Sequence, residues 1–123
     1  MNTPPSIQRI GSHSRWSDVV LYNGVARWVE VAEDTTGDAA SQIRQILQQI
    51  DTTLASLQAE RSQLLEITIH LADLSHMPDL NVLWDHWVIP NHAPIRACVQ
   101  SGLGGTCLAE FIIHAAAPQP STV

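Results

Sequence analysis

Two side chains of opposite charge, Arg96 and Glu110, are the strongest candidates for chemistry in this sequence. Arg96 interrupts the apolar run of residues 94–99 (PIRACV), and Glu110 lies in a second apolar run at residues 107–113 (CLAEFII). A guanidinium keeps its charge in ordinary protein surroundings and recognises carboxylates through paired hydrogen bonds. A nearby carboxylate can activate water as a general base. The pair is therefore compatible with hydrolysis of a small carboxylate, and at least equally with an interfacial salt bridge.

Histidine and cysteine side chains are the other candidates, but their spacing does not favour a catalytic or metal site. The histidines show no HExxH or similar pattern, and His70, His86 and His92 fall on different predicted elements. Cys98 would act as a nucleophile only with a base and an oxyanion hole, and no motif supplies either. We therefore expect no metal site, and we interpret Cys98 as a packing or pocket residue.

Composition limits the classes of function that the chain can have. Its 123 residues suit one domain with a single core, spanning residues 1–123. Six basic and twelve acidic residues give a net charge of −6, which opposes binding to nucleic acid. No apolar run is long enough to cross a membrane, and the first residues lack a secretory signal. The cytoplasm is therefore the expected location.

The cysteines and the chain ends give two further expectations. Cys98 and Cys107 form no CxxC motif, so buried free thiols are favoured over a disulfide across a hairpin. Both ends are rich in Pro, Ser and Thr and show no periodicity, and we expect residues 1–7 and 117–123 to be flexible.

Hydrophobic periodicity predicts the order β-β-α-β-α-β-β for the elements that position these residues. An Asn-Gly turn joins two strands at residues 18–22 and 25–31. A first helix of about five turns follows Asp38 as its N-cap, and a second helix begins at Pro78 and ends before Pro90. The remaining strands are expected at residues 64–71, 94–100 and 107–116, with a short extra strand near residues 8–12.

Two amphipathic helices can cover only one face of such a sheet, which predicts a two-layer α+β domain with one mixed sheet. Alternation along each strand then assigns side chains to the two faces. The face toward the helices is expected to hold Leu65, Ile67, Ile69, Ile95, Ala97, Val99, Ala109, Phe111 and Ile113. The opposite face is expected to hold Arg96, Cys98, Gln100, Leu108, Glu110, Ile112 and His114. This second face is too apolar for open water, so we predict that the protein is a homo-oligomer.

Four segments, taken in order, carry a family resemblance. Residues 15–24 (RWSDVVLYNG) form an opening strand region, and residues 53–88 form a helix–strand–helix segment that includes Asn81 followed by an aromatic at Trp84. Residues 92–103 contain a Pro-x-Arg-x-x-Val signature, and residues 109–117 form a closing strand that bears a glutamate. In this order the segments resemble the Rid family, also called YjgF or L-PSP, and most closely its YoaB-like branch.

This resemblance implies a chorismate-mutase-like fold assembled as a homotrimer with three clefts between subunits. Family members of the archetypal type hydrolyse reactive enamine or imine intermediates, such as 2-aminoacrylate, to 2-keto acids and ammonia. By analogy, Arg96 binds the substrate carboxylate and Glu110 positions or activates the attacking water. The backbone around Cys98 contacts the imine nitrogen, and Trp16 and Asn81 belong to the pocket. The implied ligand is a small 2-imino or 2-keto acid, with no metal and no organic cofactor.

The sequence departs from the family pattern at Val29 and Glu30, where the family has a small residue followed by Gly. A glycine there lets the backbone approach the ligand closely. The carboxylate of Glu30 could instead pair with Arg96 and compete with an anionic substrate. We therefore expect Glu30 to weaken or retune deaminase activity. The SGLGGTC turn at residues 101–107 is also shorter than in the family.

Three functions are compatible with the resemblance. An imine or enamine deaminase is the leading one. A non-catalytic trimeric binding or regulatory protein would use the same cleft for small carboxylates. The endoribonuclease activity associated with some relatives ranks last, because a trimer of chains that each carry −6 would repel RNA.

Overall fold

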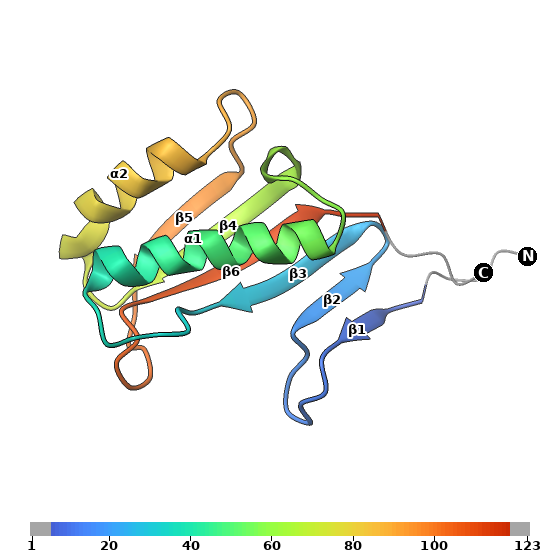
Figure 1. Ribbon diagram of the computed structural model, residues 1–123, viewed down its shortest axis with the longest axis horizontal. Helices are drawn as coiled ribbons and strands as arrows, with labels where there is room; N and C mark the ends of the chain where they lie inside the picture. Colours follow the sequence, from blue (N-terminus) through green and yellow to red (C-terminus); the bar gives the residue numbers. More distant parts are fainter. Residues whose placement is uncertain (1–5, 119–123) are drawn as a thin grey trace, which may run out of the picture.

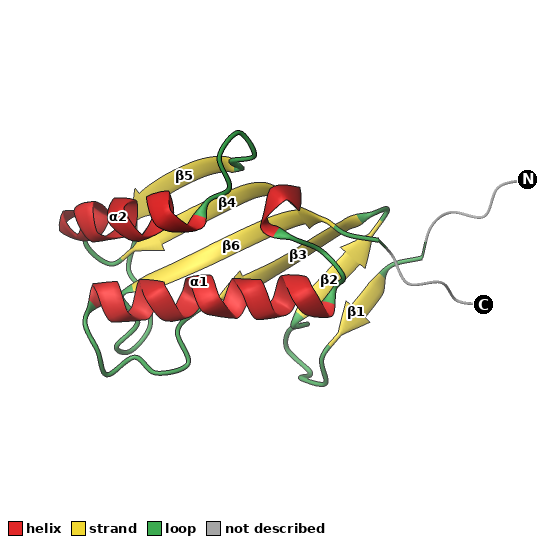
Figure 2. Cartoon of the chain, turned by 45° about the horizontal axis from the view of Figure 1, so that its top comes forward, coloured by secondary structure: helices red, strands yellow, loops and turns green. Residues whose placement is uncertain are grey.

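The structure, a computed structural model, describes residues 6–118. In this range the chain forms one six-stranded sheet with two α-helices (Figure 1). The strand order is β1-β2-β3-β6-β4-β5, in which β4 and β5 are parallel and all other neighbouring strands are antiparallel. Both helices pack on the same side of the sheet (Figure 2). The predicted two-layer α+β architecture with a mixed sheet is therefore confirmed.

The elements follow the predicted order, and the short extra strand is β1. The strands are β1 (Gln8–Ile10), β2 (Val19–Tyr22), β3 (Val25–Glu30), β4 (Leu64–Leu71), β5 (Ile95–Gln100) and β6 (Ala109–Ala116). The helices are α1 (Ala39–Ser56) and α2 (Met77–Trp87), and single 3₁₀ turns η1 (Arg61–Gln63) and η2 (Leu74–His76) precede β4 and α2. No helix within residues 6–118 has the length and apolar character needed to cross a membrane.

The expected flexible ends, residues 1–7 and 117–123, lie mainly outside the described range. Ala117 lies inside it and is fixed in place, since it is 4% exposed and its N–H donates to the carbonyl of Gly24. The flexibility of the two ends stays a prediction.

Local sequence signals account for the ends of most elements. Asn23 and Gly24 both have positive φ (53° and 79°), as a two-residue hairpin turn between β2 and β3 requires. The side chain of Asp38 accepts a hydrogen bond from the N–H of Ser41 at 2.9 Å and caps α1 as predicted. Pro78 lies in the first turn of α2, where a missing N–H costs nothing.

The core fills the space between the helices and one face of the sheet. From β4 and β6, Ile67, Ile69, Phe111 and Ile113 are fully buried, as the alternation predicts. From the helices, the fully buried large apolar side chains are Ile43, Ile46, Ile50, Leu54 and Leu80. The sequence patterns of α1, β4 and β6 are clear because each of these elements has one face wholly covered.

The predicted orientation of β5 is wrong. Arg96 pairs with Ile67, and Cys98 with Ile69, in the parallel β4–β5 ladder. Residues directly opposite each other in neighbouring strands project to the same face, so Arg96 and Cys98 lie on the helix side with the buried Ile67 and Ile69. Gln100 lies on that side as well, and Ile95, Ala97 and Val99 lie on the open face.

The error has a physical reason. Because β5 is an edge strand that the helices cover only in part, its apolar side chains are not the buried ones: Ile95 is 68% exposed and Val99 42% exposed. Arg96 instead lies against α2. A similar correction applies to Leu65, which is 45% exposed because the register shifts between Leu64 and Glu66 and brings Leu64 into the core.

Candidate functional site

The guanidinium of Arg96 is held on the helix side of β5 by two side chains of α2. Its Nη2 donates a hydrogen bond to Oδ1 of Asn81 at 2.9 Å, and its Cζ lies 5.4 Å from the centre of the Trp84 ring. Asn81 and Trp84 are three residues apart, so they share one face of α2. A hydrogen bond and a cation–π contact together fix the direction of the head group while leaving other N–H donors available.

The helix that supports Arg96 is itself anchored by a charged cluster. Arg61 makes a bidentate ion pair with Asp51 at 2.8 and 2.7 Å, and its Nη1 donates to the backbone carbonyl of Trp87 at 3.0 Å. The indole N–H of Trp87 donates to the same Asp51 at 3.0 Å. Trp87 and Trp84 are in ring contact, with centroids 5.5 Å apart. Contacts therefore run without a break from Asp51 to Arg96.

Arg96 has no ion-pair partner among the carboxylates of residues 6–118. Among residues 6–118 the ion pair of Arg61 with Asp51 is the only one within the chain. Glu30, expected as a partner, lies on the helix side of β3 and accepts hydrogen bonds from Gln49 at 2.9 Å and Thr53 at 3.1 Å. Two strands, β6 and β4, separate β3 from β5 in the sheet. Within one chain Glu30 therefore lies apart from Arg96, and its competition for Arg96 in a cleft between subunits stays a prediction.

Cys98 lies on the same face as Arg96 and packs partly against the core. Burial raises the pKa of the Cys98 thiol, and the positive charge of Arg96 offsets part of that effect. A raised pKa keeps the thiol protonated at neutral pH, and the thiolate is the nucleophilic form. This agrees with the interpretation of Cys98 as a packing or pocket residue.

We expect the alkylation of Cys98 by iodoacetamide to reflect this raised pKa. In a Cys107→Ser background, the rate in the folded protein should keep rising with pH beyond the point where the rate in urea has levelled off. At neutral pH it should be slower than in urea, because a smaller fraction of the thiol is ionised. Adding Arg96→Gln should move the pH midpoint higher still. A folded-state midpoint at or below the value in urea would contradict the assignment.

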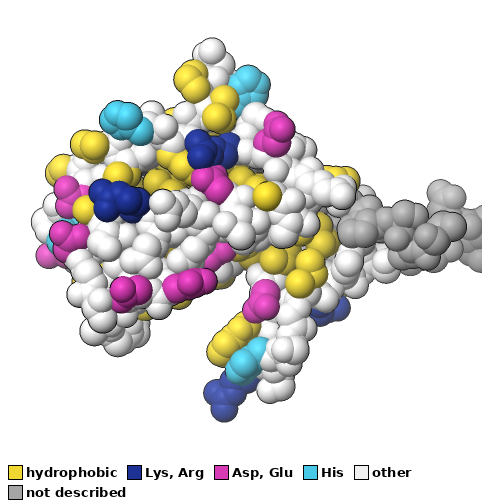
Figure 3. Space-filling view, viewed as in Figure 1, with side chains coloured by type: hydrophobic (Ala, Val, Ile, Leu, Met, Phe, Trp, Pro, Cys, Tyr) yellow, Lys and Arg dark blue, Asp and Glu magenta, His cyan; other side chains and the backbone are white. Residues whose placement is uncertain are grey.

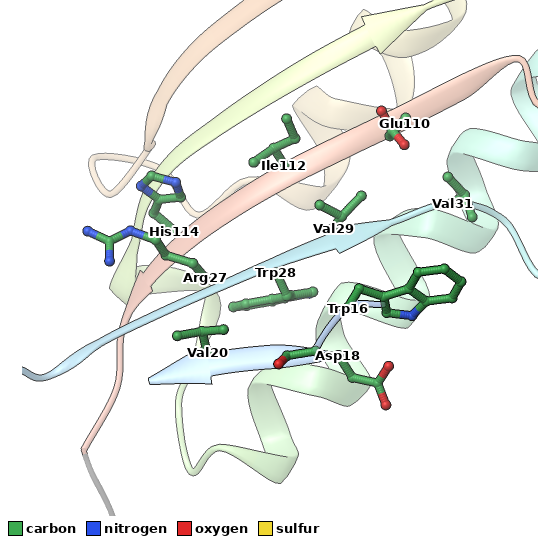
Figure 4. Close-up of a pocket in the computed structure, with 11 residues that line it drawn as sticks. Trp16, Asp18, Val20, Arg27, Trp28, Val29, Val31, Glu110, Ile112 and His114 are labelled. Atoms are coloured by element: carbon green, nitrogen blue, oxygen red, sulfur yellow. The ribbon is translucent and has the colours of Figure 1, made fainter. Parts of the chain in front are cut away.

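Glu110 lies on the other face of the sheet, beside an open cavity of about 860 Å³. Trp16, from the loop between β1 and β2, lies at one end of this cavity, and Val29 and Ile112 form part of its floor (Figure 4). Trp16 is 59% exposed and stacks on His13 with ring centroids 3.7 Å apart. This cavity brings together three of the residues expected in a pocket: Trp16, Val29 and Glu110.

Apart from Glu30, which lies against α1, the predicted site residues form two separate groups in one chain. Arg96, Asn81 and Cys98 lie on the helix side at the β5 edge, whereas Glu110 lies with Trp16 on the open face. The two groups lie on opposite faces of the sheet, and β4 lies between the strands β5 and β6 that carry Arg96 and Glu110. Arg96 and Glu110 cannot meet on one face of one chain, contrary to the sequence-based assignment.

The cavity also contains Asp18 and Arg27, which the sequence interpretation missed, and His114, which it placed on this face without a role. Asp18 lies beside Trp16, and Arg27 and His114 lie side by side at the other end (Figure 4). Strict alternation along β3 from the buried Ala26 and Trp28 would have placed Arg27 on the open face. The alternation of residues 25–30 therefore could have identified Arg27 from the sequence alone.

Two wider observations limit the chemistry. Within residues 6–118, no three His, Cys, Asp or Glu side chains come together as a metal site. On the face shown in Figure 3, basic side chains are separated from one another and interspersed with acidic ones, which is unlike the continuous basic surface that binds nucleic acid.

Comparison with known proteins gives consistent matches. The sequence profile described as "Endoribonuclease L-PSP" matches residues 6–104. The RutC family protein YoaB of Escherichia coli K12 is 41% identical over 98 residues, which are 80% of this chain and 86% of YoaB. A RutC family protein of Haemophilus ducreyi is 38% identical over 112 residues, which are 89% of this chain and 96% of that protein.

Solved structures agree with the fold. A protein from Pseudomonas aeruginosa superimposes with a TM-score of 0.87 at 34% identity, over 92% of this chain and all (100%) of that one. A member of the YjgF protein family from Neisseria meningitidis superimposes with a TM-score of 0.85 at 30% identity, over 94% of this chain and 98% of that one.

Proposed function

Since the chain belongs to the Rid (YjgF/L-PSP) family, in its YoaB-like branch, we propose that it hydrolyses reactive 2-imino acids to 2-keto acids and ammonia. The observation that carries this proposal is the state of Arg96. Its guanidinium is oriented by Asn81 and Trp84, and among residues 6–118 no carboxylate pairs with it. A fixed, uncompensated guanidinium is suited to binding the carboxylate of a small substrate.

The proposed reaction needs few groups. Water adds to the carbon of the protonated C=N bond, and the carbinolamine then expels ammonia, so that an iminium and water give a ketone and ammonium. Arg96 holds the substrate carboxylate. Glu110 accepts a proton from the attacking water and returns one to the leaving nitrogen. Because a protonated imine is already electrophilic, orientation and one polarised water supply most of the catalysis.

This mechanism requires two copies of the chain, because Arg96 and Glu110 lie on opposite faces of the sheet. We propose that the active assembly is a homotrimer, in which the β5 edge of one subunit meets the cavity of the next. The open face supports such an association: Val29, Ile95 and Val99 are 53%, 68% and 42% exposed there. Three equivalent clefts would then result from one type of contact.

Subunit complementation tests both parts of the proposal. Imines are generated in situ from L-2-aminobutyrate by an amino-acid oxidase, and their hydrolysis is followed as loss of the adduct that they form with semicarbazide. Arg96→Ala and Glu110→Gln should each be nearly inactive alone. Co-expression of the two variants should recover about a quarter of wild-type activity, because random assembly in equal amounts, with trimers of a single variant included, makes about one cleft in four that combines intact Arg96 with intact Glu110.

Each possible failure has a distinct meaning. If the wild-type protein binds 2-oxobutanoate but does not accelerate imine hydrolysis, the deaminase proposal is wrong and a binding function takes its place. If the wild-type protein is active but the co-expressed variants recover no activity, Arg96 and Glu110 do not share a cleft.

A further inference from the structure

The cavity on the open face extends well beyond Glu110, and its far end carries a positive charge. Arg27 and His114 lie together there, opposite the end that holds Trp16 (Figure 4). In the single chain the cavity has a volume of about 860 Å³ and runs from Trp16 and Glu110 to Arg27 and His114, so its far end lies well away from the carboxylate proposed to activate water (Figure 4). The far end therefore offers space and a charge that the proposed chemistry does not use.

Strand geometry gives the distance between the two ends. Glu110 and His114 are four residues apart on β6 and lie on the same face, which corresponds to about 13 Å between them. Arg27 is the direct partner of His114 in the β3–β6 ladder, so its side chain projects to that face as well. Val29 and Ile112 pair with each other between the two ends and give the floor an apolar centre.

The charge of Arg27 is not compensated locally. Arg27 is exposed, and within residues 6–118 it has no carboxylate at ion-pair distance. The acidic residue next in register is Glu66, which lies beyond His114 as the partner of His114 on β4. Asp18 lies beside Trp16, at the other end of the cavity (Figure 4). A guanidinium beside an imidazole, reached over an apolar floor, suits a carboxylate at the end of an aliphatic chain.

We propose that Arg27, with His114 beside it, binds a distal carboxylate of the substrate, so that the preferred substrates are 2-imino acids with a carboxylate-terminated aliphatic side chain. This inference rests on the proposed function, since it assigns a substrate class to the same cleft. Arg27 acts on specificity alone: it lies far from the reacting carbon and takes no part in the proton transfers.

Binding of keto-acid products tests the inference without depending on turnover. The affinities of 2-oxoadipate and 2-oxopimelate are compared by calorimetry with those of 2-oxohexanoate and 2-oxoheptanoate, which have the same chain lengths but no distal carboxylate. Wild-type protein should bind the two diacids about tenfold more tightly than the matched monoacids. Arg27→Gln should abolish this difference and leave the affinity for the monoacids unchanged.

Arg9→Gln is the matched control. Arg9 pairs with Val20, which pairs with Arg27, so Arg9 lies on the same face, two strands from Arg27 and outside the lining of the cavity. This variant should keep the full preference for diacids. Equal binding of diacids and monoacids by wild type, or equal weakening of both by Arg27→Gln, would overturn the inference while the deaminase proposal stands. Wild type that binds none of the four acids and hydrolyses no imine would overturn the proposed function itself.

Discussion

Replacement of Arg96 by alanine is expected to lower kcat/KM for hydrolysis of 2-iminobutanoate by about a hundredfold to a thousandfold. The variant loses the only group proposed to bind the substrate carboxylate, and it also loses the orientation that this contact gives to the imine carbon. Most of the effect should appear as a raised KM, because the carboxylate is bound in both the ground state and the transition state.

Arg96→Lys sharpens this test. Lysine keeps the positive charge but lacks the planar fork that can bond Asn81 and a carboxylate at the same time. It should therefore retain an intermediate activity, about tenfold below wild type. Subunit mass and far-ultraviolet circular dichroism serve as controls for assembly and folding. An Arg96→Ala protein that is assembled and within twofold of wild-type kcat/KM would exclude Arg96 as the carboxylate anchor.

Replacement of Gln42 by leucine is expected to lower the free energy of unfolding by about 2–4 kcal/mol. Gln42 is the one fully buried polar side chain within residues 6–118. Its Nε2 donates to the carbonyls of Thr35, Gly37 and Thr106 at 3.1–3.3 Å, and its Oε1 accepts from the N–H of Leu108 at 2.8 Å. Leucine would leave these backbone groups without a protein partner.

Gln48→Leu on the same helix is the matched control, because Gln48 is exposed and should change stability by less than about 0.5 kcal/mol. Urea unfolding at one fixed subunit concentration measures both variants, since assembly makes apparent stability depend on concentration. Equal midpoints for Gln42→Leu and wild type would show that water replaces the lost contacts at no cost.

A helix, strand or turn can be predicted from the sequence when the contacts that determine it lie close together in the chain or cover one of its faces completely. The Asn23-Gly24 turn and the Asp38 cap are local devices, and the structure contains both. Strands β4 and β6 are covered by helices on one face, so their alternation identified Ile67 and Phe111 as core residues. In these places a short stretch of sequence is enough to determine the local structure and the buried face.

The failures occurred where the deciding contact is distant in sequence. Arg96 was assigned to the wrong face because its partners, Asn81 and Trp84, belong to a helix whose reach over the edge strand no local pattern encodes. Glu30 was expected near Arg96, but within one chain its carboxylate bonds to α1 instead. Gln42 lies on the apolar stripe of α1, between Ala39 and Ile46, and that position was an unused signal of a buried polar contact.

The edge position of β5 has a consequence for what a ligand can contact. An inner strand uses the N–H and C=O groups on both of its sides in ladders, whereas β5 has β4 as its single neighbour in the described sheet. On its outer side, alternate peptide groups of β5 remain without a strand partner, in the same stretch of backbone that carries Arg96 and Cys98. The main chain there can therefore donate and accept hydrogen bonds as a fixed template, so that recognition of a small polar molecule need not depend on side chains alone.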